Sequence, residues 1–232
     1  MQPTPIALRV HDLQQTIRHL EASGLRAPGT VQLLAVSKGR SQEEILEAVH
    51  AGLCDFGENY YQEALCKINA LASYPLCWHF IGPIQRNKTS GIARHFSWVH
   101  GLCRVDVAER LNKARLLSAP PLQVCIQVNL DDEPTKSGLQ RDEVLDVARA
   151  IIALPRLRLR GLMIIPRPES TATARYATFL RLAQLLAELN QALGTHLDTL
   201  SMGMSDDLDE AIRAGSTMLR IGRGLFGERP IR

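Results

Sequence analysis

The stretch from Val31 to Lys38 (Val-Gln-Leu-Leu-Ala-Val-Ser-Lys) constrains the fold more than any other part of this chain. An apolar run of this length is typical of a strand buried on both faces, as in the parallel sheet of an α/β protein. The run ends on a lysine, and in an α/β barrel the carboxyl ends of the strands carry the chemistry. A desolvated lysine amine there can lose its proton and attack a carbonyl. Lys38 is therefore a candidate nucleophile, although strand-end lysines can also lie along the rim with the amine in solvent.

Similar apolar runs recur along the chain and alternate with helical patterns. A leading amphipathic helix is predicted over residues 5–22. The predicted strands are the run ending at Lys38, 52–57, 76–81, 96–100, 122–129, one within 157–165, 199–201 and 217–221, and the predicted helices are 41–50, 59–71, 84–94, 104–117, 140–153, 170–192 and 206–214. Eight such alternations predict a single-domain (β/α)8 TIM barrel over residues 1–232. A doubly wound sheet would carry a glycine-rich phosphate loop after its first strand, and this sequence has none there.

Composition narrows the class of protein. Hydrophobic residues make up 45% of the chain, enough for a sizeable core, and a formal net charge of +3 without an aromatic-interleaved basic stripe predicts no nucleic-acid partner. No apolar run reaches membrane-spanning length and the N-terminus lacks a signal-peptide pattern, so we expect a cytoplasmic protein without a membrane partner. The cysteines, Cys54, Cys66, Cys77, Cys103 and Cys125, show no C-x-x-C spacing. Their arrangement favours reduced thiols over disulfides or a zinc site.

Glycines and polar residues concentrate where the last two predicted strands end. Gly222 and Gly224 follow the eighth strand, and Ser201 and Gly203 lie at the seventh. Because glycine lacks a Cβ, backbone N–H groups at such positions can approach phosphate oxygens, and barrels frequently bind phosphate on these two loops. The alternative is that the glycines only turn the chain and that Ser201 caps a short helix.

Two other residues have more than one interpretation. Arg220 lies inside the apolar run 218–221, and a buried guanidinium needs an acceptor. That acceptor is either a carboxylate, such as Asp207 or Glu58, or a ring nitrogen of a bound ligand, which would then stay unprotonated. His79 is compatible with a hydrogen-bonded core imidazole and with a catalytic one.

Motifs of several residues occur in order along nearly the whole chain: Ala35-Val-Ser-Lys38, Phe56-Gly-Glu-Asn-Tyr60, Trp78-His-Phe-Ile-Gly-Pro83, Asn87-Lys88, Gln127-Val-Asn129, Lys136-Ser-Gly138, Gly161-Leu-Met163, Leu200-Ser-Met-Gly-Met-Ser-Asp-Asp207, Arg220-Ile-Gly222 and Phe226-Gly227. Together they closely resemble the pyridoxal-phosphate homeostasis protein family. That family is similar to the barrel domain of bacterial alanine racemase without its second, β-rich domain. The resemblance therefore implies a barrel of the alanine racemase N-terminal type.

The resemblance also implies a cofactor, pyridoxal 5′-phosphate, and the residues that bind it. Lys38 would form the internal aldimine, a Schiff base with the cofactor's aldehyde. Arg220 would face the pyridine nitrogen. The implied cofactor-binding residues are Lys38, Asn59, His79, Ser201, Gly203, Met204, Ser205, Arg220, Gly222 and Arg223. Of these, Ser201 and the backbone around Gly222 and Arg223 would hold the phosphate.

The implied function is that of a carrier and regulator in vitamin B6 homeostasis, a monomer that passes the cofactor to apo-enzymes. An arginine opposite the ring nitrogen prevents its protonation and makes the ring a poor electron sink, which suits holding the cofactor better than turnover. One alternative is a pyridoxal-phosphate-dependent racemase or lyase, with Lys136 or His79 as the second base. Another is a protein-binding adaptor that senses the cofactor.

This chain departs from the family pattern at three positions. Gly39 stands where the family usually has threonine, Arg86 where it usually has serine, and Arg223 where it usually has threonine. Losing the hydroxyl at 223 removes one predicted phosphate hydrogen bond. A guanidinium can replace it with a stronger, charge-assisted one.

Overall fold

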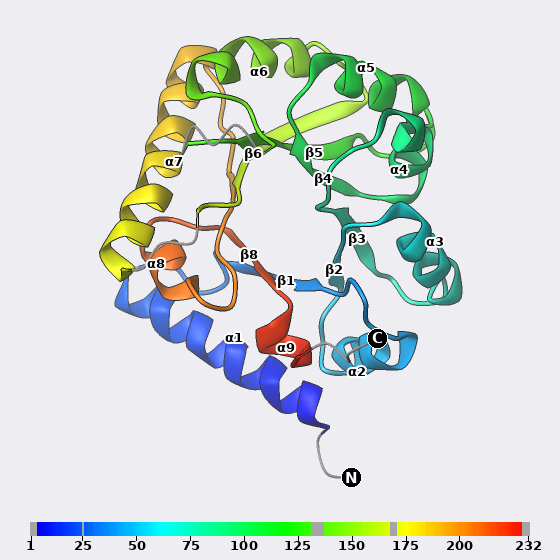
Figure 1. Ribbon diagram of the computed structural model, residues 1–232, viewed down its shortest axis with the longest axis vertical. Coiled ribbons are helices and arrows are strands. Elements are labelled where there is room, and N and C mark those ends of the chain that lie inside the picture. Colours follow the sequence, from blue (N-terminus) through cyan, green and yellow to red (C-terminus); the bar gives the residue numbers. More distant parts are fainter. Residues whose placement is uncertain (1–3, 25, 131–136, 168–170, 229–232) are drawn as a thin grey trace.

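Eight parallel strands close into a barrel, each paired with the next along the chain and the last paired with the first (Figure 1). The computed structural model describes residues 4–24, 26–130, 137–167 and 171–228. The strands are β1 (Gln32–Val36), β2 (Asp55–Glu58), β3 (Cys77–Phe80), β4 (Trp98–Leu102), β5 (Leu122–Val128), β6 (Leu157–Ile164), β7 (Thr199–Ser201) and β8 (Met218–Ile221). The barrel predicted from the alternating pattern is therefore confirmed.

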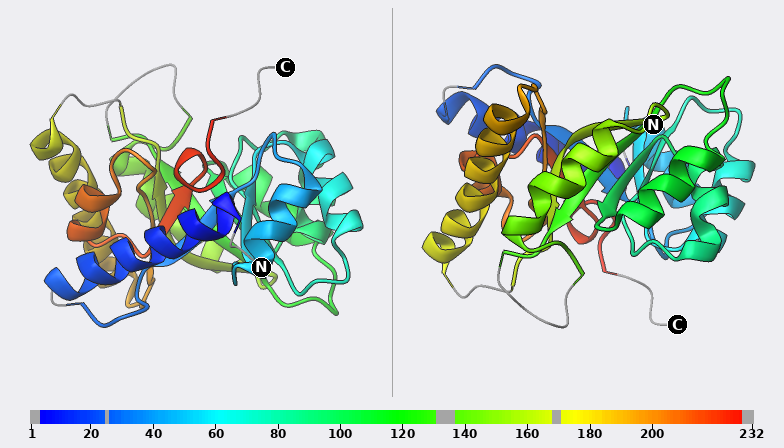
Figure 2. Two further views of the ribbon diagram at one scale, coloured as in Figure 1. Left: turned by 90° about the horizontal axis from the view of Figure 1, so that it is seen from below. Right: turned by 90° about the horizontal axis from the view of Figure 1, so that it is seen from above.

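Helices form a ring around the strands, as the views along and across the barrel show (Figures 1 and 2). They are α1 (Pro5–Ser23), α2 (Gln42–His50), α3 (Tyr61–Ala70), α4 (Thr89–His95), α5 (Val105–Ala114), α6 (Val144–Ile152), α7 (Ala172–Leu193), α8 (Leu208–Arg213) and α9 (Arg223–Phe226), with 3-10 turns η1 (Arg86–Lys88) and η2 (Arg141–Glu143). None of the helices in the described parts of the chain is long and apolar enough to cross a membrane.

The predicted leading helix is α1, which lies outside the ring against α2, α8 and α9 (Figure 1). Its start follows from the sequence, because Pro5 occupies the first helical position and the Thr4 hydroxyl accepts from the Ala7 N–H at 3.2 Å. Ile6, Val10, Ile17 and Leu20 are buried on its inner face. The helix therefore covers the part of the barrel where the first and last strands meet.

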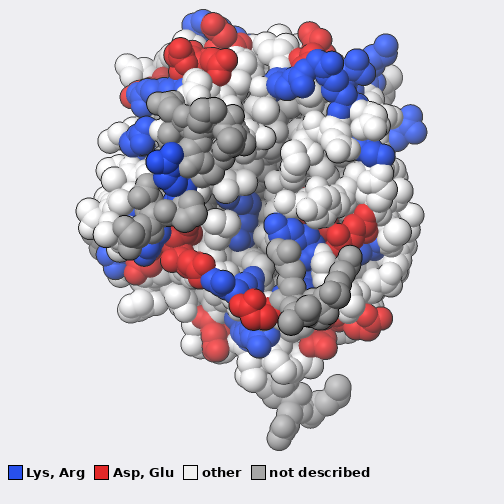
Figure 3. Space-filling model, viewed as in Figure 1, with Lys and Arg blue, Asp and Glu red and all other residues white. Residues whose placement is uncertain are grey.

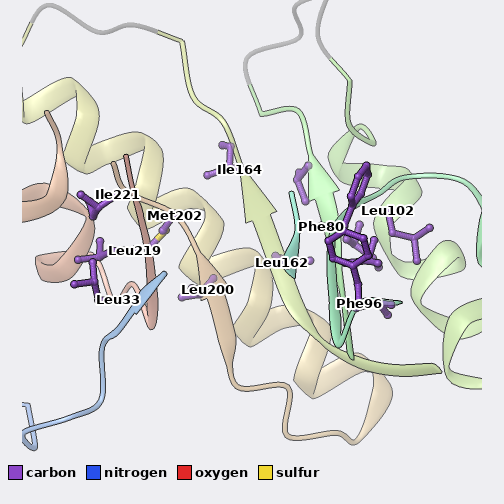
Figure 4. Close-up of a cluster of buried hydrophobic side chains, with 14 of the residues drawn as sticks. Leu33, Phe80, Phe96, Leu102, Leu162, Ile164, Leu200, Met202, Leu219 and Ile221 are labelled. Carbon is purple, nitrogen blue, oxygen red and sulfur yellow. The ribbon is translucent and has the colours of Figure 1, made fainter. Parts of the chain in front are cut away.

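The side chains of β1 alternate between two apolar regions, as expected for a barrel strand. Leu33 and Ala35 of β1 belong to a large cluster between the strands and the helices, part of which Figure 4 shows. Leu34 and Val36 belong to a small separate cluster with Ile81 and Met218. Most of the apolar core thus lies outside the barrel wall.

Some predictions of local structure were wrong in detail, and one short helix was not predicted. The strand predicted at 96–100 begins two residues later, since the Phe96 N–H still bonds to Ile92 O at the end of α4. The helix predicted over 84–94 is divided into η1 and α4. The short helix α9 was not predicted, because its four residues carry no measurable amphipathic period.

Gly161 of β6 tests how tightly this barrel is packed. A Cβ at this position would lie 1.9 Å from the carbonyl oxygen of Thr199 in β7, so the two strands would have to separate. We expect Gly161→Ala to lower the free energy of unfolding by about 3 kcal/mol, measured by urea denaturation.

Gly194→Ala is the matched control. Gly194 ends α7 with φ of +61°, and nothing lies within 4 Å of an added Cβ there. Only left-handed backbone strain of about 1 kcal/mol should result. Equal losses in the two variants would contradict the packing role of Gly161.

Candidate functional site

A cavity of about 780 Å³ opens at the carboxyl ends of the barrel strands. Figure 3 shows basic side chains around a hollow on this face. The lining residues are Val36, Lys38, Arg40, Asn59, Ile81, Ile165, Pro166, Arg167, Arg175, Met204, Ser205, Asp206, Asp207, Arg220, Gly222, Arg223, Gly227 and Glu228. Six of these lining residues are lysine or arginine and three are aspartate or glutamate, so the described lining carries a net positive charge that suits an anionic ligand.

Lys38 lies two residues past the end of β1 and is half-buried in this lining. The backbone on both sides of it is tied to α3. Lys67 Nζ donates to the carbonyl oxygen of Ser37 at 2.7 Å, and the Gly39 N–H donates to Glu63 Oε1 at 2.5 Å. Lys38 is therefore presented from a fixed segment, as a reactive amine requires.

A buried ion-pair network supports this segment. The Lys67 ammonium contacts Glu58 Oε1 at 2.7 Å and Glu63 Oε1 at 2.6 Å, and the Ser37 hydroxyl donates to Glu58 Oε1 at 2.6 Å. Glu58 is completely buried. Burial raises the pKa of Glu58, while the charge of Lys67 and its hydrogen bond oppose the rise. The carboxylate that ends β2 thus depends on Lys67.

Arg40 joins the same segment to the end of the chain. Its Nη1 donates to the carbonyl oxygens of Glu228 and Phe226 at 3.1 and 3.4 Å, and its Nη2 donates to that of Gly227. The guanidinium also lies 5.5 Å from the centre of the Phe226 ring. Arg40 therefore fixes α9 and the residues after it next to Lys38.

Arg220 of β8 reaches the cavity from the barrel interior and is only 5% exposed. Its Nη1 donates to the carbonyl oxygen and hydroxyl of Ser201 at 2.6 and 2.9 Å, and its Nη2 donates to the Ile164 carbonyl at 2.8 Å. Burial lowers its pKa to about 10, and Asp207 opposes that fall. Glu58, the other carboxylate considered from the sequence, contacts Lys67 instead.

His79 lies in a row of polar side chains that crosses the barrel. His79 Nε2 is 3.0 Å from Asp55 Oδ1, and His79 Nδ1 is 3.0 Å from His100 Nε2. His100 Nδ1 lies 2.8 Å from the Ser201 hydroxyl, which Arg220 also contacts. His79, His100 and Ser201 have no exposed surface, and burial lowers the pKa of both histidines.

The loops after β7 and β8 meet beside Arg220. The Gly224 N–H donates to the Ser205 hydroxyl at 3.0 Å, and the Arg223 guanidinium binds Asp206. Gly203 has φ of +95°, and a Cβ there would lie 2.6 Å from Ala211 Cβ. The turn itself thus requires glycine at 203, which agrees with the alternative that this glycine only turns the chain.

Seven of the ten predicted cofactor-binding residues line this one cavity: Lys38, Asn59, Met204, Ser205, Arg220, Gly222 and Arg223. His79, Ser201 and Gly203 are not among its lining residues. Lys136, a predicted second base, lies outside the described residues. All ten assignments stay predictions, since position alone does not test binding.

Sequence reasoning missed Arg40, Lys67 and the pairing of His79 with His100. Lys67 occurs nine residues after Glu58, with no pattern that marks either as buried. The sequence gives no signal for the contact between the histidines, because His79 is in register with Trp98 and not with His100. The two rings meet across the strand stagger, which a single strand does not encode.

Known sequences and structures are similar over nearly the whole chain. Residues 11–230 match the family model described as alanine racemase, N-terminal domain. The chain is 52% identical over 224 residues to a pyridoxal phosphate homeostasis protein of Pseudomonas aeruginosa, covering 97% of this chain and 96% of that protein. It is 47% identical over 225 residues to the protein of that name from Escherichia coli K12, covering 94% and 96%.

Two solved structures show the same barrel. PipY of Synechococcus elongatus PCC7942, with PLP bound, is 35% identical with a TM-score of 0.85, covering 96% of this chain and 100% of that chain. Alanine racemase from Corynebacterium glutamicum is 17% identical with a TM-score of 0.71, covering 97% of this chain and 60% of that one. The second similarity concerns the fold alone.

The network beneath Lys38 predicts a pH-dependent loss of stability in Lys67→Met. The variant leaves the buried Glu58 carboxylate without its cation, so we expect about 3–5 kcal/mol less free energy of unfolding near pH 8. The pKa of Glu58 in the folded state then lies further above its unfolded value. The folded state holds that proton more tightly, so the deficit should be small at pH 4 and should grow as the pH rises.

Urea denaturation of wild type and variant at pH 4, 6 and 8 measures this dependence. Arg149→Met is the control, because Arg149 pairs with Asp146 at an exposed site and should contribute less than about 0.5 kcal/mol. A deficit in Lys67→Met that is constant with pH would contradict the dependence of Glu58 on Lys67.

Proposed function

The chain belongs to the pyridoxal phosphate homeostasis protein family, and we propose that it binds pyridoxal 5′-phosphate and holds it through Lys38 for delivery to other proteins. The observation that carries this proposal is the single cavity that brings Lys38, Arg220 and Gly222 together. These residues come from the two ends of the chain, and the pairing of β1 with β8 joins them.

The cavity's own chemistry fits this cofactor. A phosphorylated pyridine aldehyde requires an amine, a cationic surface and hydrogen-bonding groups around a ring. Lys38 supplies the amine and the arginines of the lining supply the cations. Asn59, also in the lining, has a buried Oδ1 that finds no hydrogen-bond partner among the described residues. A buried polar atom of this kind is costly unless a ligand satisfies it.

We assign each of these cavity residues a role in binding the cofactor. When bound, the cofactor supplies an aldehyde and an electron-withdrawing ring. Lys38 would hold the aldehyde and Arg220 would face the ring nitrogen. Ser205 and the backbone at Gly222 and Arg223 would hold the phosphate.

Two side chains predicted to contact the phosphate, Arg223 and Ser201, already have other partners. Arg223 already binds Asp206, so a phosphate would have to draw the guanidinium from that carboxylate. The Ser201 hydroxyl already contacts His100 and Arg220. We therefore assign the phosphate to Ser205 before either of these side chains.

We further propose that the protein carries the cofactor and does not turn over amino acids. No histidine, cysteine or tyrosine is among the described residues that line the cavity. A racemase or lyase needs a second group that exchanges a proton near neutral pH. His79, one of the two bases considered, is completely buried within the barrel. Cytoplasmic location, monomeric state and apo-enzyme recipients remain parts of this proposal.

Lys38→Ala tests the proposed attachment. Wild-type protein incubated with pyridoxal 5′-phosphate should gain an absorbance band, and borohydride should then fix the cofactor's mass on the peptide that contains Lys38. The variant should show neither change, while Lys113→Ala, which removes an exposed lysine of α5, should behave as wild type. Cofactor mass on another lysine would contradict the assignment.

Solvent exchange tests the absence of turnover. In heavy water, the cofactor-loaded protein should add deuterium to the α-carbon of amino acids no faster than the same concentration of free pyridoxal 5′-phosphate, because the described lining of the cavity offers no histidine, cysteine or tyrosine as a second proton-transfer group. The measurement is mass spectrometry of a panel of L- and D-amino acids. Faster exchange by the wild type with any of them would replace the carrier with the enzyme alternative.

A further inference from the structure

A continuous line of hydrogen bonds connects Arg220 at the cavity with Asp55 at the opposite end of the barrel. It passes through Ser201, His100 and His79, with successive separations of 2.9, 2.8, 3.0 and 3.0 Å. The five residues come from β8, β7, β4, β3 and β2. We propose that Asp55, His79, His100 and Ser201 are positioning residues that fix the orientation of the Arg220 guanidinium through one directed chain of hydrogen bonds.

The direction of the chain follows first from its cationic end. Arginine has only donors, so the Ser201 oxygen accepts from Arg220. A serine hydroxyl has a single proton, and the Ser201 oxygen also lies 2.8 Å from His100 Nδ1. A buried hydroxyl proton without an acceptor is costly, so Ser201 donates to His100. His100 Nδ1 is then an acceptor without a proton.

The anionic end gives the same direction independently. The Asp55 carboxylate has only acceptors, and burial, which would raise its pKa, is outweighed by its hydrogen bonds, among them the bond with His79. His79 Nε2 must therefore carry a proton and donate. Because His100 Nδ1 has no proton, His100 Nε2 carries one and donates to His79 Nδ1, so the His79 ring is neutral, in agreement with the lowering of its pKa by burial. Both ends thus assign both histidines to the Nε2–H tautomer.

Every bond in the chain then has one donor and one acceptor. Two neutral imidazoles separate the cation of Arg220 from the anion of Asp55, and nothing polar inside the chain is left unsatisfied. This arrangement holds the Nη1 edge of Arg220 against β7. The guanidinium therefore keeps one orientation toward the cavity, where it would meet the ring nitrogen of the proposed cofactor.

A metal ion is the competing explanation for the far end. Asp55, Cys77 and His79 each have one potential metal-ligand atom, and these three atoms lie within 4.8 Å of one another. A metal would need the lone pair of His79 Nε2, since a protonated nitrogen cannot coordinate. The chain places a proton on that nitrogen, so the geometry favours the hydrogen bond to Asp55.

Nuclear magnetic resonance of the cofactor-free protein tests the chain directly. Long-range proton–nitrogen spectra should show His79 and His100 as neutral Nε2–H tautomers. Ser201→Ala should change the signals of both rings, whereas Ser216→Ala should change neither. Ser216 is an equally buried serine whose hydroxyl donates to Met202 O at 2.7 Å, outside the chain. An Nδ1–H tautomer at either ring, or loss of the His79 Nε2 proton on adding Zn²⁺, would overturn the proposal.

Variants of Asp55 test positioning at the cavity, a step that rests on the proposed function. Asp55→Ala removes the last acceptor and should weaken the affinity for pyridoxal 5′-phosphate about three- to tenfold. Asp55→Asn keeps an acceptor oxygen and should restore both the tautomers and the affinity to within about twofold. Asp198→Ala is the control. Asp198 lies just before β7 and its carboxylate binds Arg160, outside the hydrogen-bonded chain, so this variant should keep the wild-type affinity for pyridoxal 5′-phosphate.

Equal losses in the Ala and Asn variants, or an unchanged affinity in Asp55→Ala, would overturn the positioning role. The proposed function fails by a different result, namely that wild type takes up no cofactor or that Lys38→Ala retains the covalent attachment. The tautomer spectra are recorded without cofactor, so they test the proposed chain of hydrogen bonds whether or not the proposed function is correct.

Discussion

The pairing of β1 with β8 is the constraint on which the rest of this molecule depends. Leu34 lies in register with Arg220, and Ala35 with Ile221, although these partners are 186 residues apart. Four residues after Leu34 comes Lys38, and two after Arg220 comes Gly222. Without this closure neither the amine nor the glycine loop would border the cavity. The site is therefore a product of the closed topology and not of any local motif.

Closure also divides the side chains into two environments with different tasks. The large apolar cluster lies between the strands and helices, while the apolar cluster inside the barrel contains only Leu34, Val36, Ile81 and Met218 among its buried members. A barrel interior is usually filled with layers of branched aliphatic residues. Here two histidines and an arginine occupy part of that space. Burial in the outer layer supplies the hydrophobic stabilisation that lets the interior be polar.

The sequence predicted the features that depend on periodicity and strand ends. The barrel, the leading helix and the polar rim containing Lys38 and Arg220 all followed from apolar runs and what terminates them. Asp207, named from the sequence as a candidate acceptor for Arg220, attracts its charge, whereas the hydrogen bonds of the guanidinium go to Ser201 and Ile164. The pairing of His79 with His100 could not be derived, because which inward residues meet across a barrel depends on strand stagger, which no single strand encodes. The buried state of Lys67 depends likewise on how α3 packs.

Two of the buried cations, Lys67 and Arg220, show how one fold separates support from binding. Lys67 contacts two carboxylates, so its charge is neutralised where it lies, beneath the segment that carries Lys38. Arg220 donates instead to two carbonyls and a hydroxyl, which satisfy its N–H groups without cancelling its charge. Neutral acceptors cost more in stability than a carboxylate partner would, and burial correspondingly lowers the pKa of Arg220. That cost leaves a positive potential at the cavity, where an anionic ligand can use it.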